Sequence, residues 1–405
     1  MRLTIDIDRK TLVGMLAGAV ITVIVVVLLY GLFGGSDNSA TPIEDIGPRS
    51  ADAPAAQAPE QPSGSSDPSG SEGSGGSEND TSRVEEDDDV EEFVASQEPP
   101  DIAVPLGKGL IDCPEATVTV EDATGFAEAL EAAEPGAVIK LEPGVYVGRF
   151  VAAVSGTENQ PIFICGSPEA IIDGGGVKEG YALHLNEVSH VRLVGFTVRN
   201  SQKGVMADRT TNTTIQQLTV HHIGDEAIHL RNFSTDNTVQ YCMVYATGLR
   251  REKFGEGVYL GTAESNWATF SGGKMDRSDR NTVRGNVIRA TAEAIDIKEG
   301  TSGGHILGNV FDGSSLGGSK HNDSWVDVKG NGYLIQGNTG SGTNEDGFQT
   351  HKIVDGWGTG NVFRANVIDL GNSGGFGIND TAGGNKIACD NKVTGGLLSK
   401  TDVCS

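Results

Sequence analysis

Short segments with two inward-facing, mostly apolar residues around one variable position recur from residue 181 to the C-terminus. Eight of them align on one another: Leu183/Leu185, Val205/Ala207, Ile228/Leu230, Val258/Leu260, Ile295/Ile297, Val326/Val328, Phe348/Thr350 and Phe376/Ile378. The closest repeats, from 183 to 205 and from 205 to 228, are 22 and 23 residues apart. Strands that recur at this period with no helix between them predict a coil whose successive turns pair in parallel.

A second column keeps step with the first. It consists of an apolar residue, a position three further on, and an apolar residue two beyond that: Leu193/Phe196/Val198, Ile215/Leu218/Val220, Val239/Cys242/Val244, Val283/Asn286/Ile288, Ile306/Asn309/Phe311 and Phe363/Asn366/Ile368, and more loosely around Asn338 and Asp390. The middle position changes from apolar residues to Asn along the chain. This change predicts a buried stack of amides, each bonded to the next turn. The two columns together predict an all-β solenoid.

The chain before the solenoid divides into three parts. Residues 1–10 end in Arg9 and Lys10, and residues 11–33 are 23 uncharged, mostly aliphatic positions, long enough to span a bilayer. The positive flank predicts a cytoplasmic N-terminus and a C-terminal domain at the cell surface, unless the segment is cleaved as a signal peptide. Residues 34–104 carry 18 acidic and two basic residues among Ser, Gly and Pro, which predicts a disordered linker. The folded domain is expected over residues 105–405, with an amphipathic helix at 122–133 capping its open end.

The charge and the cysteine content indicate which partners and which compartment suit this domain. Of the formal net charge of −25, residues 34–104 contribute −16 and residues 1–10 about +1, which leaves −10 for residues 105–405. An acidic surface argues against a nucleic-acid partner. Cys389 and Cys404 are expected to pair, Cys113 and Cys165 are a possible second disulfide, and Cys242 is expected to be a buried free thiol. We expect a monomeric domain in an oxidising compartment.

The outward positions of the first strand form three columns down the stack. The position between the inward residues is His184, Met206, His229, Tyr259, Asp296, Asp327, Gln349 and Gly377. The position after them is Asn186, Asp208, Arg231, Gly261, Lys298, Lys329, His351 and Asn379. The position two before the first inward residue is Tyr181, Lys203, Glu226, Glu256, Glu293, Ser324, Asp346 and Gly374. We expect Asp296 to stack on Asp327 and Lys298 on Lys329, since adjacent turns lie about 4.8 Å apart.

Stacked like charges destabilise a sheet, so their concentration in the middle turns suggests a function. Carboxylates beside lysines suit β-elimination on a uronic-acid polysaccharide, in which Ca²⁺ would neutralise the sugar carboxylate. We expect Lys298 to be the base, with Lys329 or Arg231 lowering its pKa or gripping the sugar, next to Asp327. The predicted metal ligands are Glu256, Glu293, Asp296 and Glu226. The predicted substrate contacts are Trp325, facing outward as a sugar platform, with Tyr259, His229, Gln349 and His351. The alternative is a solvated ladder of weak surface ion pairs without catalytic activity.

Several segments resemble a known family. Pro143-Gly144-Val145-Tyr146, the helix and the repeat are similar to right-handed parallel β-helix proteins of the pectate lyase superfamily, over about residues 110–405. Motifs such as Asp296-Ile297-Lys298-Glu299-Gly300 resemble a group of secreted actinobacterial β-helix proteins, which implies the fold and no particular activity.

The spacing of Glu293 and Lys298 is similar to that of the metal-binding acid and the base lysine in alginate and chondroitin lyases. That family has an arginine one turn later, where this chain has Lys329. Gly224-Asp225-Glu226 faintly resembles the acidic pair of polygalacturonases, so a glycoside hydrolase is the second interpretation. However, Asp296 replaces the arginine of their Arg-Ile-Lys motif. The third interpretation is a glycan-binding adhesin without catalysis.

Overall fold

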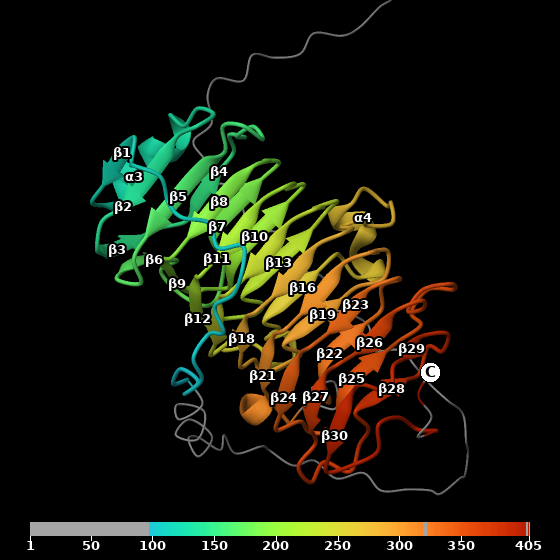
Figure 1. The fold of residues 1–405 in the computed structure, drawn as a ribbon. Helices are drawn as coiled ribbons and strands as arrows, with labels where there is room; N and C mark the ends of the chain where they lie inside the picture. The colour runs from blue at the N-terminus through green and yellow to red at the C-terminus, as the bar shows by residue number, and fades with distance from the viewer. Residues whose placement is uncertain (1–96, 319–321, 402–403, 405) are drawn as a thin grey trace, which may run out of the picture. The chain divides into compact units, whose positions relative to one another are not determined.

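The computed structural model describes residues 97–318, 322–401 and 404, and within them three parallel sheets coil into a solenoid (Figure 1). Sheet A contains β1 (Val118–Val120), β2 (Val138–Leu141), β5 (Ile162–Gly166), β8 (Val191–Val194), β11 (Thr214–Gln216), β14 (Thr238–Gln240), β17 (Thr282–Arg284), β20 (His305–Leu307), β23 (Leu334–Gln336), β26 (Val362–Arg364) and β29 (Lys386–Ile387). Sheet B contains β3 (Gly144–Val147), β6 (Ala170–Asp173), β9 (Thr197–Ser201), β12 (Thr219–Ile223), β15 (Met243–Tyr245), β18 (Val287–Ile288), β21 (Val310–Asp312), β24 (Thr339–Ser341), β27 (Val367–Asp369) and β30 (Lys392–Thr394). Sheet C contains β4 (Phe150–Ala152), β7 (Tyr181–Asn186), β10 (Lys203–Asp208), β13 (Ile228–Arg231), β16 (Val258–Leu260), β19 (Ile295–Ile297), β22 (Ser324–Val328), β25 (Asp346–Thr350) and β28 (Ile378–Asp380).

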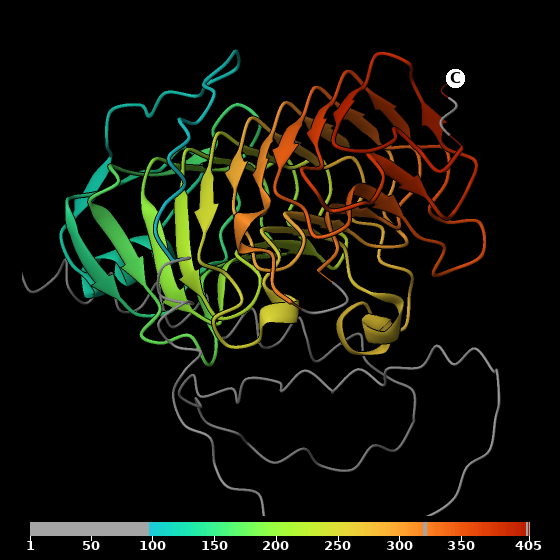
Figure 2. The same ribbon diagram turned by 90° about the horizontal axis from the view of Figure 1, so that it is seen from below.

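Each turn passes from sheet A to sheet B to sheet C, and the next turn begins in sheet A again (Figure 2). The corner between sheets A and B is short, as in the two residues between β17 and β18. The other two corners carry the insertions, which contain η1 (Glu252–Phe254), η2 (Glu264–Asn266), α4 (Trp267–Phe270) and η3 (Gly313–Ser315). The loops with α4 and η3 connect to the two ends of the sheet C strands. The long loops therefore border sheet C and leave the A–B corner bare.

The register of sheet C agrees with the predicted one in seven of the eight turns. Val205 pairs with Leu183 and with Ile228, and the alignment continues to Phe348. The last turn differs, because Phe348 pairs with Ile378 instead of Phe376, and Asn379 lies opposite Gln349. A slip of two residues preserves the alternation of inward and outward side chains, so the sequence pattern could not reveal it.

Buried side chains form one continuous hydrophobic core along the described solenoid. The predicted amide stack is present at the A–B corner. The Oδ1 of Asn309 accepts hydrogen bonds from Asn286 N and Nδ2, while Asn309 Nδ2 donates to Val283 O and to Asn338 Oδ1. The stack continues through Asn366 to Asn391, which takes the place predicted for Asp390. The amides satisfy one another along the stack, so they remove the cost of burying polar groups.

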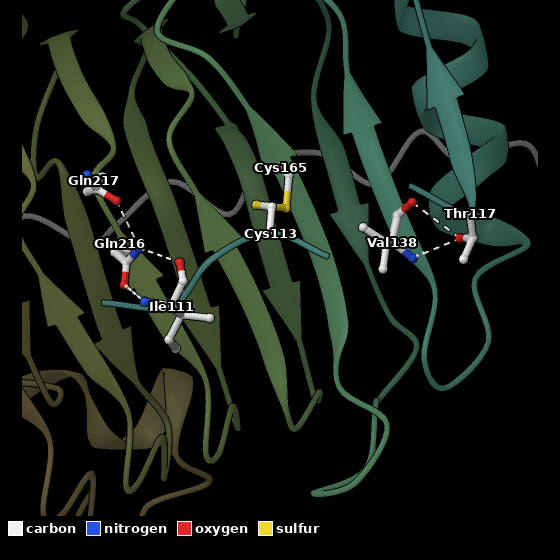
Figure 3. The surroundings of a disulfide bond; sticks show 7 residues. All are labelled: Ile111, Cys113, Thr117, Val138, Cys165, Gln216 and Gln217. Carbon is white, nitrogen blue, oxygen red and sulfur yellow. Dashed lines mark hydrogen bonds between the residues drawn. A yellow bond between two sulfur atoms is a disulfide. The ribbon is translucent and has the colours of Figure 1, made fainter. Parts of the chain in front are cut away.

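The N-terminal part of the described chain packs on the solenoid at two places. Helix α3 (Ala123–Glu131), within the predicted range, begins after the N-cap Asp122 and buries Phe126 and Leu130 in the core. Before it, residues 97–117 form an extended segment, the strap, that runs along sheet A. On the strap, Ile111 N donates to Gln216 Oε1 and Gln216 Nε2 donates to Ile111 O (Figure 3).

The expected disulfide and the second pairing that the sequence left open are both present. Cys113 on the strap is bonded to Cys165 in β5 (Figure 3), and Cys389 is bonded to Cys404. Cys242 is a buried free thiol as predicted, and burial raises its pKa to about 12. A thiol with this pKa stays protonated and unreactive at neutral pH.

The predicted cytoplasmic end, membrane span 11–33 and most of the predicted linker 34–104 lie outside the described residues. Within the described ranges, we find no helix with the length and apolar character needed to cross a bilayer.

We predict that Asn309→Leu lowers the free energy of unfolding by about 3 kcal/mol, because the buried N–H groups of Asn286 lose their acceptor. Thermal and denaturant unfolding measure this change. The matched control is Asn159→Leu on an exposed loop, which should change the stability by less than about 0.5 kcal/mol. A loss below about 1 kcal/mol for Asn309→Leu would contradict a structural role for the amide stack.

Candidate active site on sheet C

Sheet C arranges the predicted polar column on adjacent strands. Tyr259 in β16 pairs with Asp296 in β19, Asp296 pairs with Asp327 in β22, and Gln349 in β25 comes next. The predicted stacking of Asp296 on Asp327 is therefore confirmed. Because like charges on neighbouring strands repel, this arrangement needs positive charge close by.

Three buried carboxylates converge beside this column. Oxygen atoms of Glu256, Glu293 and Asp296 all lie within 4.8 Å of one another, and the three residues are 4%, 6% and 2% exposed. The Oε2 of Glu256 is buried without a hydrogen-bond partner. Glu226, predicted as a fourth ligand, is not part of this group and forms an ion pair with Lys203.

The three carboxylates differ in their tendency to ionise. Burial and the charges of Glu226 and Asp296 raise the pKa of Glu256 well above its usual range, and burial with Asp327 and Asp296 does the same to the pKa of Glu293. Burial acts on Asp296 in the same direction, but Lys298 and Lys329 outweigh it and lower the pKa of Asp296. Asp296 is therefore the ionised member of the group. Glu256 and Glu293 need either a proton or a nearby cation.

The two lysines meet at Asp296. Lys298 Nζ lies 2.6 Å from Asp296 Oδ2, and Lys329 Nζ lies 2.9 Å from both Asp296 Oδ1 and Asp327 Oδ2. The prediction that neighbouring groups lower the pKa of Lys298 is wrong. Burial alone lowers this pKa, but the charges of Asp296 and Glu299 raise it above the usual value. Lys298 is therefore an ammonium ion in this structure.

Asp327 joins His351 to the same network. His351 Nε2 lies 3.3 Å from Asp327 Oδ1, at ion-pair distance but without hydrogen-bond geometry, while Ser324 Oγ donates to Oδ1 at 3.0 Å. Lys329 and His351 together lower the pKa of Asp327 against the effect of its burial. Gln349 Nε2 donates to Asp346 Oδ2 at 3.0 Å, so its amide is directed to the border of the sheet.

Arg231 is engaged in a separate cluster. Its Nε donates to Asp208 Oδ1 at 2.8 Å, and its guanidinium stacks 4.0 Å from the centre of the Phe270 ring in α4. We therefore do not assign Arg231 to the lysine network, contrary to the expectation from the sequence. Tyr259 does belong there, because Lys298 Nζ lies 4.9 Å from the centre of its ring.

His229 in β13 lies next to Tyr259 on the adjacent strand, with ring centres 4.3 Å apart. Its Nε2 donates to the Gly261 carbonyl at 2.9 Å, and its buried Nδ1 has no hydrogen-bond partner and lies 3.7 Å from Glu226 Oε1. His229 is 5% exposed, and its ring packs against Tyr259, so its main contact in this structure is with that ring.

The prediction that Trp325 faces outward is wrong. The side chain is 1% exposed and packs near Phe311 and Phe348 in the core. Its indole lies over Gly340, where an added Cβ would come within 2.5 Å of Trp325 Cε3. The neighbouring turns have Ala or Gly at the position of Trp325, so a period-2 pattern gave no sign that this second residue of β22 points inward.

The sequence pattern missed Glu299. This carboxylate is 2% exposed, accepts a hydrogen bond from Glu264 N at 2.5 Å and helps to keep Lys298 charged. Its position directly after Lys298 in the chain is the feature of the sequence that could have identified it as a site residue. The acidic pair Asp225 and Glu226, proposed for a hydrolase, is already neutralised by Arg250 and Lys203.

Comparison with solved structures identifies a relative. The chain is 33% identical to an alginate lyase from Paenibacillus sp. strain FPU-7, with a TM-score of 0.67, and the match covers 72% of this chain and 100% of that lyase. The chain belongs to the family of this lyase. As a family member it is a right-handed parallel β-helix protein of the pectate lyase superfamily, as the sequence motifs suggested.

A more distant match agrees on the fold alone. Pectate lyase Pel9A is 15% identical, with a TM-score of 0.51, over 67% of this chain and 72% of that enzyme. No protein-family model matches the sequence, and a search of the curated proteins finds no match.

The three convergent carboxylates offer ligand atoms of the kind that Ca²⁺ prefers. Ca²⁺ prefers several carboxylate oxygens, and in this family member Glu256, Glu293 and Asp296 supply them from adjacent turns. The unpartnered Oε2 of Glu256 is a free ligand atom. These three residues therefore fit a divalent cation, without Glu226.

We predict that Glu256→Gln raises the melting temperature in the presence of a chelator, by about 2 °C or more, and more at pH 8 than at pH 5. A carboxyl group whose pKa rises on folding destabilises the protein as the pH increases from about 4.3 through the raised value. The amide of Glu256→Gln does not ionise, so this loss of stability with rising pH disappears. The amide also reduces the repulsion among the carboxylates and therefore stabilises the fold. Thermal scans at both pH values measure the change.

The exposed Glu158→Gln serves as the control and should leave both melting temperatures unchanged. Added Ca²⁺ should raise the melting temperature of the natural chain more than that of Glu256→Gln. A lower melting temperature for Glu256→Gln at both pH values would refute the electrostatic account of the cluster.

Proposed function

We propose that this protein is a polysaccharide lyase that cleaves a uronate polymer by β-elimination, with alginate as the first candidate substrate. The observation that carries the proposal is the meeting of Lys298 and Lys329 at Asp296, beside the convergent carboxylates of Glu256 and Glu293. The whole-length similarity to an alginate lyase supports the same reaction class and suggests the substrate.

The reaction places three demands on the site. The proton next to the sugar carboxylate must be removed, the negative charge that develops must be stabilised, and the leaving sugar oxygen must receive a proton. The C–H and C–O bonds break, and a C=C bond forms between the two carbons. An enzyme for this reaction therefore needs a base beside positive charge, and sheet C has both groups on adjacent turns.

We assign the roles from the contacts. Ca²⁺, when bound by Glu256, Glu293 and Asp296, supplies positive charge that offsets the sugar carboxylate and the charge of Asp296. With the charge of Asp296 offset, Lys298 loses its own proton to solvent and becomes the neutral base that takes the proton from the sugar carbon. The ammonium group formed in this way returns a proton to the leaving sugar oxygen. Lys329, placed between Asp296 and Asp327, stabilises the negative charge that develops on the sugar carboxylate. Tyr259 keeps its proton, because burial and the nearby carboxylates raise its pKa, and it lies against Lys298 as a sugar contact.

The location is part of the proposal. We propose an anchor at residues 11–33, with the solenoid outside the cytoplasm, where a polysaccharide would be accessible. The two disulfides support an oxidising compartment for the domain, since such bonds are rare in the cytosol.

We predict that the purified protein, incubated with alginate and Ca²⁺, releases products with the ultraviolet absorbance of an unsaturated uronide. Lys298→Ala should lower the rate by about 100-fold or more, the usual contribution of a positioned base. The control Lys352→Ala removes an exposed lysine paired with Asp355 and should leave the rate unchanged.

Other outcomes identify other functions. New reducing ends without the absorbance would indicate a hydrolase. Binding to alginate, polygalacturonate or chondroitin with neither signal would indicate a glycan-binding module. Unchanged turnover in Lys298→Ala would remove Lys298 from the role of base.

A further inference from the structure

Two adjacent histidines on sheet B point to the same side of their strand. His221 and His222 lie in β12, with their Nδ1 atoms 2.6 Å apart. Successive side chains of a strand normally alternate between the two faces. His222 breaks this alternation because its φ is +54°, in the left-handed region. The backbone therefore adopts an uncommon conformation that brings the two imidazoles together.

The neighbouring turns hold the pair in place. The His221 ring stacks on Tyr245 in β15, with ring centres 4.9 Å apart and planes 4° apart. On the other side, Arg199 in β9 pairs with His221 along the sheet and is itself bonded to Asp173 at 2.8 Å. Both histidines are half-buried, so an ion from solvent can reach them.

The geometry excludes two protonated nitrogens at the contact. Two N–H groups cannot face each other at 2.6 Å, so at least one Nδ1 presents a lone pair. An imidazole nitrogen needs such a free lone pair to bind a metal ion.

The spacing of the nitrogens indicates which ion would fit. Two ligand nitrogens about 2.0 Å from one ion are about 2.8 Å apart at 90° and about 3.3 Å apart at the tetrahedral angle. The observed 2.6 Å is closer to the 90° arrangement. Cu²⁺ and Ni²⁺ prefer this square-planar geometry, and imidazole suits both.

We propose that His221 and His222 form a binding site for a transition-metal ion of the Cu²⁺ or Ni²⁺ type, chelated by their two Nδ1 atoms. The site lies on sheet B, whereas the candidate active site lies on sheet C, and it uses imidazole nitrogen ligands in place of carboxylates. It does not depend on the proposed lyase activity.

The strap begins beside this site. Arg289 Nη1, in the turn after Tyr245, donates to the carbonyl of Glu98 at 3.1 Å. The negative charge of Glu98 acts on His222 and on Tyr245, which favours a cation there and partly offsets Arg199. An ion bound by the histidines would therefore lie next to the point at which the described chain reaches the solenoid.

Copper titration of the full-length, tag-free protein tests the proposal. With Ca²⁺ in excess to occupy carboxylate sites, one equivalent of Cu²⁺ should give an electron paramagnetic resonance spectrum with splitting from two bound imidazole nitrogens. Carboxylates cannot produce this signature. Calorimetry should show the same stoichiometry.

The variants are chosen to preserve the fold. His221→Phe keeps the ring stacked on Tyr245, and His222→Asn retains a residue that tolerates positive φ. Each should abolish the two-nitrogen pattern and weaken Cu²⁺ binding at least tenfold. His305→Phe, an exposed histidine on sheet A, is the matched control and should change neither. Unchanged melting temperatures confirm that each variant is folded.

A natural chain without the two-nitrogen spectrum would overturn the proposal and leave a proton shared between the rings as the role of the contact. Variants that bind Cu²⁺ as the natural chain does would overturn it as well. Loss of lyase activity has no bearing on this result, because the measurement follows the metal alone.

Discussion

Parallel pairing between successive turns is the constraint on which every other feature of this protein depends. It fixes neighbouring strands about 4.8 Å apart and in register, so each inward residue stacks on its counterpart in the next turn. Leu183, Val205 and Ile228 become neighbours although 22 or 23 residues separate them along the chain. The same register acts on the outward side chains, which the core does not select. Outward side chains of successive turns therefore form columns along the solenoid, and a functional site in this fold is built from such columns.

A column of like charges is unfavourable, and the site shows how the fold tolerates one. Asp296 and Asp327 lie on adjacent strands, and Lys329 bridges them at 2.9 Å from each. Lys298 and Lys329 balance Asp296, while Glu256 and Glu293 are left without cations of their own, so their pKa values rise. This imbalance concentrates negative potential at one buried point. A bound metal ion or the protonation of a carboxyl group would neutralise this negative charge. A ladder of ion pairs that served stability alone would not need carboxylates without partners.

Other parts of each turn stabilise the solenoid against the unbalanced charge on sheet C. The amide stack through Asn286, Asn309 and Asn338 satisfies the buried polar groups of the A–B corner. The glycine at position 340 leaves space for the large core residue Trp325. The histidine pair on sheet B is another local departure, because His222 takes a left-handed conformation that most residues avoid. The fold tolerates such local deviations from regular strand geometry where both neighbouring turns pair with the strand.

The sequence by itself determined the solenoid, its register over seven turns, the amide stack, the Cys389–Cys404 disulfide and the stacking of Asp296 on Asp327. Apart from the disulfide, each of these follows from a periodic pattern, which a repeat makes visible. The Cys113–Cys165 pairing was left open by the sequence and was decided by the structure. Tertiary structure decided what the period does not encode. The two-residue slip at Ile378 keeps the alternation, Trp325 packs inward within β22 against that alternation, and the contact of Arg231 with Phe270 depends on how the inserted loop with α4 folds. The charge of Lys298 was likewise decided by its surroundings, because it depends on the summed field of Asp296 and Glu299 in a buried site and not on spacing along the chain.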